Sequence, residues 1–237
     1  LISTPLYSSA ASDVYKRQAD ADPLYKDALA GRRNALGDAH PHTLTSMNDL
    51  GNLYFTHGQS HMRSEDWAKA RTAYQACLEI RTTRFGKDDW RVTDARLSLA
   101  DVDLFEKMTP ADRKTAQKAE ELLAEARLLH DQMKHTEAQA LNAECLELRR
   151  RVLGEEHRGY AVALTSLAIS HRELKEFAKA ELLLVRALEL RQKLYGKAHP
   201  NYAHSLNTLA TVYDRAGQYD KAEPLYRQAL DLRTRLL

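Results

Sequence analysis

A spaced pattern of glycine, arginine, leucine and small residues recurs along the chain and limits the fold more than any other feature. Its reference points are Gly37, Gly86, Gly154 and Gly196. An arginine stands five residues before each glycine, a leucine eight before, and small residues nine and sixteen before. Spacings of seven and eight place the leucine and small residues on one helical face, where a second helix can approach closely. We expect the arginines to lie off this face, in solvent.

Each position holds a narrow set of side chains in all four copies. The arginines are Arg32, Arg81, Arg149 and Arg191, and the small residues nearest the glycine are Ala28, Cys77, Cys145 and Ala187. A fifth copy without its glycine lies at the C-terminus, where Ala222, Ala229 and Arg233 keep the spacing. The two cysteines are therefore predicted to be small core residues rather than nucleophiles.

A second helix is predicted after each glycine. Its start is marked by His40-Pro41 and His199-Pro200, because proline at the first helical position sacrifices no hydrogen bond. A leucine follows thirteen residues after each glycine, and the next residue is always small. Gly58 and Gly217 suit the C-terminus of this helix in the left-handed conformation. The chain is thus predicted to be all-α, a series of antiparallel helix pairs whose most regular period is 42 residues.

The run Leu50-Gly51-Asn52-Leu53-Tyr54 resembles the signature of the tetratricopeptide repeat, and Ala222-x-x-x-Tyr226 resembles its later element. The long period and segments such as KAEPLYRQALDLR resemble the kinesin light chain subclass of these repeats. The resemblance covers nearly all of residues 19–237. It implies a right-handed superhelical solenoid of antiparallel helix pairs.

The N-terminus stands apart from this array. Residues 8–18 read SSAASDVYKRQ, which resembles an in-frame translation of a common sequencing adapter. We expect residues 1–18 to be an artefact, with a disordered native terminus as the alternative. Residues 19–237 would then form the repeat array. Since the next reference glycine is due just after Leu237, we expect the chain to be a window cut from a longer solenoid.

The pattern breaks most strongly between Gly86 and Gly154, which are 68 residues apart, 26 more than the regular period. The segment KTAQKAEELLAEARLLHDQMKH favours a helix strongly. We predict an irregular extra helix near residues 113–133, a turn near Lys134-His135, and a kink of the solenoid within 108–136. Fusion with the next helix into one long rod is the alternative. A smaller insertion after Gly58 is predicted to be a longer turn or a partner-specific loop.

The sequence offers no catalytic constellation. His40, His157 and His199 share one repeat position, which marks them as structural, and no H-E-x-x-H, paired-cysteine, phosphate-loop or G-x-S-x-G motif occurs. We therefore expect no enzyme activity, no metal and no cofactor. A net charge of +2 argues against nucleic-acid binding, and no apolar run is long enough to span a bilayer. Two cysteines in this length fit a cytoplasmic location.

In tetratricopeptide solenoids the first helix of each pair lines a concave groove. The resemblance places these residues in it: Asn48, Asn52, Phe55, Asp101, Thr165, Arg172, Asn207, Thr211 and Asp214. Asn48 and Asn207 match the position where the family often binds a peptide, and an amide can bond both main-chain groups of an extended segment. Leu97 and Thr165 depart from asparagine at that position. The alternative is that the asparagines satisfy neighbouring helices.

The predicted function is a non-catalytic protein–protein interaction scaffold that binds a peptide segment of a protein partner in this groove. The resemblance implies a kinesin light chain-like cargo adaptor. No nucleic acid, membrane or small-molecule substrate is expected as a partner. The alternative is the regulatory or sensor array of a larger enzyme or signalling protein whose catalytic domain is missing here. The groove residues are chemically mixed, so the sequence names no ligand.

Overall fold

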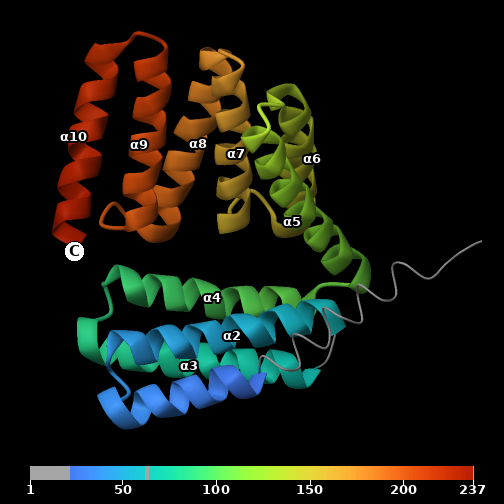
Figure 1. Cartoon of the computed structure of the whole chain (residues 1–237), viewed down its shortest axis with the longest axis vertical. Helices are drawn as coiled ribbons and strands as arrows, with labels where there is room; N and C mark the ends of the chain where they lie inside the picture. The colour runs from blue at the N-terminus through green and yellow to red at the C-terminus, as the bar shows by residue number, and fades with distance from the viewer. Residues whose placement is uncertain (1–21, 62–63, 237) are drawn as a thin grey trace, which may run out of the picture. The chain divides into compact units, whose positions relative to one another are not determined.

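The computed structural model of this protein describes residues 22–61 and 64–236, and those residues contain α-helices and no strand (Figure 1). Residues 1–18, including the adapter-like segment, lie outside the described part. Residues 22–36 are helical. The labelled helices are α2 (Pro41–His61), α3 (Ser64–Phe85), α4 (Trp90–Lys107), α5 (Pro110–Asp131), α6 (His135–Leu153), α7 (Arg158–Glu173), α8 (Phe177–Tyr195), α9 (Pro200–Arg215) and α10 (Tyr219–Leu236). The all-α prediction is confirmed.

The chain divides into two compact units, with the boundary between Met108 and Thr109. Unit 1 contains the 22–36 helix and α2 to α4, and unit 2 contains α5 to α10. Within unit 2, helices that follow one another along the chain lie side by side (Figure 1).

Histidine and aspartate side chains start the first helices of the pairs. The Nδ1 atoms of His157 and His199 each accept a hydrogen bond from the main-chain N–H two residues later, at 3.0 Å. Asp89 makes the same bond to Arg91 N at 2.8 Å. These bonds satisfy amides that have no partner inside the helix. The structural role predicted for these histidines is confirmed.

Glycine ends the second helices because the chain turns there with a positive φ. Gly154 has φ 80° and ψ 164°, and Gly196 has φ 78° and ψ 170°, a region that is essentially closed to other residues. Gly217 ends α9 with φ 73°, as predicted. The prediction for Gly58 is wrong, since α2 continues through that residue to His61. The destabilisation caused by a glycine inside a helix is small, so packing against neighbouring helices can outweigh it.

The predicted additional helix is present as α5, and a short turn separates it from α6, so the long-rod alternative is excluded. The burial pattern of α5 matches that of the first helices α7 and α9, a role that the sequence interpretation did not assign to it. Residues 42 apart in α5, α7 and α9 are equally buried, with at most 8% of each exposed: Ala119, Ala161 and Ala203; Leu122, Leu164 and Leu206; Ala126, Ala168 and Ala210. Thus α5 is the first helix of a complete pair, and unit 2 holds three pairs: α5–α6, α7–α8 and α9–α10.

The irregularity therefore lies before α5. Ala100 of α4 occupies the small position of a first helix, yet Ala126 follows it after only 26 residues instead of 42. No second helix intervenes in the sequence between α4 and α5. Ala100 is exposed, whereas its counterparts in unit 2 are fully buried.

The repeated arginines do not all lie in solvent, which corrects the sequence prediction. Arg149 is 3% exposed and Arg191 is 6% exposed. Arg149 donates to the main-chain oxygen of Gly159 at 2.7 Å and to Glu120 at 2.6 Å, and Arg81 donates to the main-chain oxygen of Arg91 at 3.1 Å. The guanidinium groups of Arg149 and Arg81 reach the first turn of the next helix, so these arginines join neighbouring pairs.

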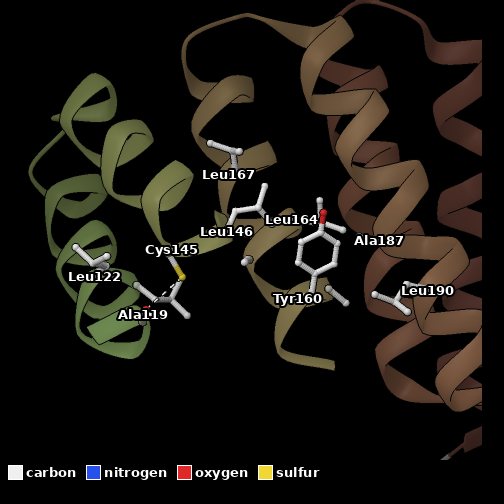
Figure 2. Close-up of a cluster of buried hydrophobic side chains, with 12 residues drawn as sticks. Ala119, Leu122, Cys145, Leu146, Tyr160, Leu164, Leu167, Ala187 and Leu190 are labelled. Carbon is white, nitrogen blue, oxygen red and sulfur yellow. Dashed lines mark hydrogen bonds between the residues drawn. The ribbon is translucent and has the colours of Figure 1, made fainter. Parts of the chain in front are cut away.

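The core of unit 2 is built from the repeated small and leucine positions. Leu122, Leu146, Leu164 and Leu190 pack with Tyr160 across α5 to α8 (Figure 2). The Sγ atom of Cys145 lies 3.2 Å from the main-chain oxygen of Ala119, a close approach that a larger side chain would prevent. Burial raises the pKa of the Cys145 thiol. Both observations agree with the core role predicted for this cysteine.

Candidate functional site

A cleft of about 390 Å³ opens against the first helices of unit 2. Residues of α5, α7 and α9 line it, together with one residue each from α6 and α8. The lining residues are Arg127, His130, Asp131, Asn142, Val162, Thr165, Ser166, Ile169, Arg191 and His204. All of them belong to unit 2.

Asn142 of α6 is the most unusual residue of the cleft. It is 1% exposed, and its Nδ2 donates to Ser170 Oγ at 2.9 Å and to the main-chain oxygen of Ser166 at 3.3 Å. A carbonyl oxygen only accepts, so these bonds fix the orientation of the amide. The Oδ1 atom is buried and has no hydrogen-bond partner. A buried acceptor left in this way costs about 1–3 kcal/mol.

The same position carries a large side chain in the other second helices of the described pairs: Tyr74, Leu184 and Tyr226. Leu184 is completely buried there. Asparagine is smaller and polar, so it leaves space and an unsatisfied atom where the repeat elsewhere places a packed side chain. Packing alone does not explain the choice of asparagine.

His130 of α5 is bonded to the same group of side chains. Its Nε2 lies 2.9 Å from Ser170 Oγ, and its Nδ1 lies 3.1 Å from Nδ1 of His135. Burial lowers the pKa of His130, and the neighbouring His135 lowers it further. Ser170 already donates to Ser166 O at 3.4 Å and accepts from Asn142, so its remaining lone pair takes the Nε2–H of His130.

The cleft presents cations and other donors. Arg191 is buried and donates to Ser205 Oγ at 2.5 Å, whereas its counterpart Arg149 is paired with a carboxylate. Desolvation and Arg191 lower the pKa of His204. Asp131 is the acidic residue of the lining. The arrangement suits a ligand rich in carbonyl or carboxylate oxygens.

The structure divides the groove residues predicted from the sequence between the two units. Thr165 lines the cleft, where its hydroxyl donates to Ala161 O at 2.9 Å. Arg172 is paired with Glu173 at 2.7 Å, and Thr211 donates to Asn207 O at 2.9 Å. Asp214 is exposed on α9.

In unit 1 the predicted groove residues make contacts within the fold. The Phe55 ring packs against Trp67 and Phe105, with ring centres 5.5 and 5.2 Å apart. Asn52 Oδ1 accepts from the Tyr74 hydroxyl at 2.6 Å, which is the structural role that the sequence left as an alternative. Asp101 is buried on α4, and Asn48 is half-buried on α2.

The sequence interpretation missed Arg127 and His130, because it compared α5 with the second helices of the pairs. A signal was available. Ala126 and Ala138 are twelve residues apart, the same spacing as Ala168 to Ala180 in the next pair. Placed in that register, Arg127 and His130 take the groove positions that Ile169 and Arg172 occupy in α7.

Two features are absent from the described residues. Residues 22–61 and 64–236 contain no group of three or more His, Cys, Asp or Glu side chains arranged to hold a metal ion. Within the same ranges, no helix combines the length and the apolar composition needed to cross a bilayer.

Models of a known sequence family agree with the helix-pair pattern. Tetratricopeptide repeat models match residues 119–193, 183–235 and 16–42, and no curated protein matches the chain. Among solved structures, BtubC (BKLC) from P. vanneervenii is 21% identical, covering 94% of this chain and 76% of its own, with a TM-score of 0.42. Nearly identical TPR-like repeats from Podosopora anserina, described as those of a kinesin light chain, are 17% identical to this chain. They cover 97% of this chain and 93% of their own, with a TM-score of 0.42.

The family-model match to residues 119–193 begins inside α5, in agreement with the role of α5 as the first helix of a pair. By these sequence models and its repeated helix pairs, the chain belongs to the tetratricopeptide repeat family.

Proposed function

We propose that this protein is an interaction scaffold that holds an extended segment of a partner protein in the cleft of unit 2. Tetratricopeptide repeats mediate protein–protein interactions, which supports the general role. The residues of the cleft support the more specific proposal, that the protein holds an extended segment of its partner there. The kinesin light chain-like cargo role and the cytoplasmic location stay predictions from the sequence.

The main support for this proposal is the buried Oδ1 atom of Asn142, which has no hydrogen-bond partner. A main-chain N–H of a bound segment would supply the donor that Oδ1 lacks, and Arg127 and Arg191 would bind its carbonyl oxygens. Residues that reduce stability without improving packing are typical of functional sites. The predicted residues Arg172, Asn207, Thr211 and Asp214 are proposed to extend this surface along α7 and α9. Asn48, Asn52, Phe55 and Asp101 lie in unit 1 and stay predictions from the sequence.

The test replaces Asn142 with the leucine found at the same position in α8. Peptides that bind residues 19–237 would first be selected from a displayed random library. Calorimetry would then measure the affinity of these peptides for the wild-type protein and for Asn142→Leu. We expect the variant to lose at least about tenfold in affinity, which is 1.4 kcal/mol, while its thermal midpoint rises because a buried unsatisfied atom is removed.

Gln228→Leu is the matched control, since it makes a similar change at an exposed position of α10. It should leave the affinity unchanged. Asn207→Ala should weaken binding with helicity retained. If Asn142→Leu stays folded and binds the selected peptides as tightly as wild type, the cleft is not the binding site.

A further inference from the structure

A second hollow, of about 380 Å³, lies in unit 1 between the 22–36 helix, α2 and α3. Met47, Leu50 and Tyr54 of α2 line it together with Leu29 and the α3 residues Ala73 and Ala76. The lining is predominantly apolar. This volume is within the range of small ligand sites.

The hollow has an identifiable origin in the repeat. Ala73 stands thirteen residues before Gly86, and the same position in the second helices of unit 2 is Leu141, Leu183 and Leu225. Each of those leucines packs against a buried cluster of its own unit. At Ala73 the isobutyl group is missing, and Ala73 is only half-buried. Ala76 likewise replaces the long side chains Glu144, Arg186 and Gln228.

Two further properties describe what would fit the space. The residues contributed by α3 run from Ala68 to Ala76, which is about 12 Å along the helix axis, or two turns. The charged residues of the lining are Arg33 and Lys69, and both are cationic. Arg33 is paired with Asp38, and the Lys69 ammonium lies 5.6 Å from the centre of the Tyr54 ring.

We propose that this hollow binds an amphipathic helix of a partner protein, through two leucine-type side chains one turn apart with acidic residues beside them. The partner's side chain takes the place of the leucine that the other second helices provide themselves. Two turns of lining accommodate two such side chains, and the cations Arg33 and Lys69 favour acidic neighbours. This site lies in unit 1 and involves none of the cleft residues of unit 2, so it is independent of the proposed function.

The probe is a short acetylated helical peptide with two leucines one turn apart and a glutamate beside each. Two control peptides carry glutamine in place of leucine, or lysine in place of glutamate. Binding to the full chain would be followed by backbone amide NMR shifts. We expect saturable shifts of Ala68 to Ala76 with the first peptide, and at least about tenfold weaker binding of both controls.

Ala73→Leu fills the hollow with the residue that the repeat uses elsewhere, so the fold should tolerate it. We expect its affinity for the probe to fall at least about tenfold and its thermal midpoint to rise. Ala76→Leu is a second filling variant should Ala73→Leu distort α3. Ala124→Leu, at an exposed position of α5, is the matched control and should bind as wild type does.

The charge preference has its own test. Lys69→Glu should weaken binding of the glutamate peptide and strengthen binding of the lysine peptide. Undiminished binding by a folded filling variant would overturn the proposal. Equal binding of the leucine and glutamine peptides would also overturn it. Binding of the fatty acid dodecanoate in the hollow, without binding of any peptide, would do the same.

Discussion

At the scale of single residues, backbone conformation explains why one turn position of the repeat favours glycine and what other residues cost there. The turn after the first helix needs a left-handed residue, and Gly217 supplies it after α9. After α7 and α5 the same position is Lys175, with φ 61°, and Met133, with φ 62°. A side chain in this region costs about 1–2 kcal/mol, so these turns carry strain that the packed helices hold in place.

Replacing Lys175 with glycine should relieve part of that strain. The gain is reduced by the larger entropy of glycine in the unfolded chain, which leaves a net stabilisation of roughly 0.5–1 kcal/mol. Urea denaturation followed by circular dichroism measures it. Gly217→Ala is the reverse change and should destabilise by about 1 kcal/mol. A Lys175→Gly variant less stable than wild type would refute this account of the turn.

At the scale of elements, side chains that bridge neighbouring helices add specific contacts to the small-residue packing. Tyr213 of α9 donates its hydroxyl to Glu181 of α8 at 2.7 Å, and Tyr54 of α2 makes the corresponding bond to Asp22 at 2.8 Å. Both tyrosines are buried residues of the signature position. The bond requires the protonated phenol, so the contact between α8 and α9 depends on pH at the alkaline end.

Burial, and then the hydrogen bond to Glu181, raise the pKa of Tyr213 to about 12. Because the folded value lies above the ordinary value of about 10, the contribution is complete below pH 10 and is lost as the pH rises towards 12. Chemical denaturation of wild type and Tyr213→Phe between pH 8 and 11 tests this. The stability difference should be constant up to about pH 10 and shrink from about pH 10 to 11, and a difference independent of pH would contradict the assignment.

At the scale of the whole molecule, the chain consists of two units with separate cores. Unit 2 contains three complete pairs with clusters that span α5 to α10, while unit 1 ends on α4, a first helix with no second helix after it in sequence. Each pair in an array of this kind is stabilised mainly by its nearest neighbours. The kink predicted near this boundary stays a prediction.

Unit 2 should therefore fold without unit 1. A fragment of residues 109–237 is expected to keep its share of the helical circular dichroism signal and to unfold in one cooperative transition. Removing the last pair, in a fragment ending at residue 195, should lower the denaturation midpoint, because α8 loses the neighbour that covers it. A disordered 109–237 fragment would show that the two cores depend on each other.

The sequence by itself determined the helix pairs, their 42-residue period, the histidine starts, the glycine ends and the core positions of the small residues. These follow from local spacing and backbone chemistry, which a single chain displays directly. It also placed Thr165 beside what became the cleft. The tertiary structure alone decided that Arg149 and Arg191 are buried, and that Asn142 and Ala73 border empty space. Those properties depend on which side chain a neighbouring helix places opposite each residue, and spacing along one helix carries no information about that.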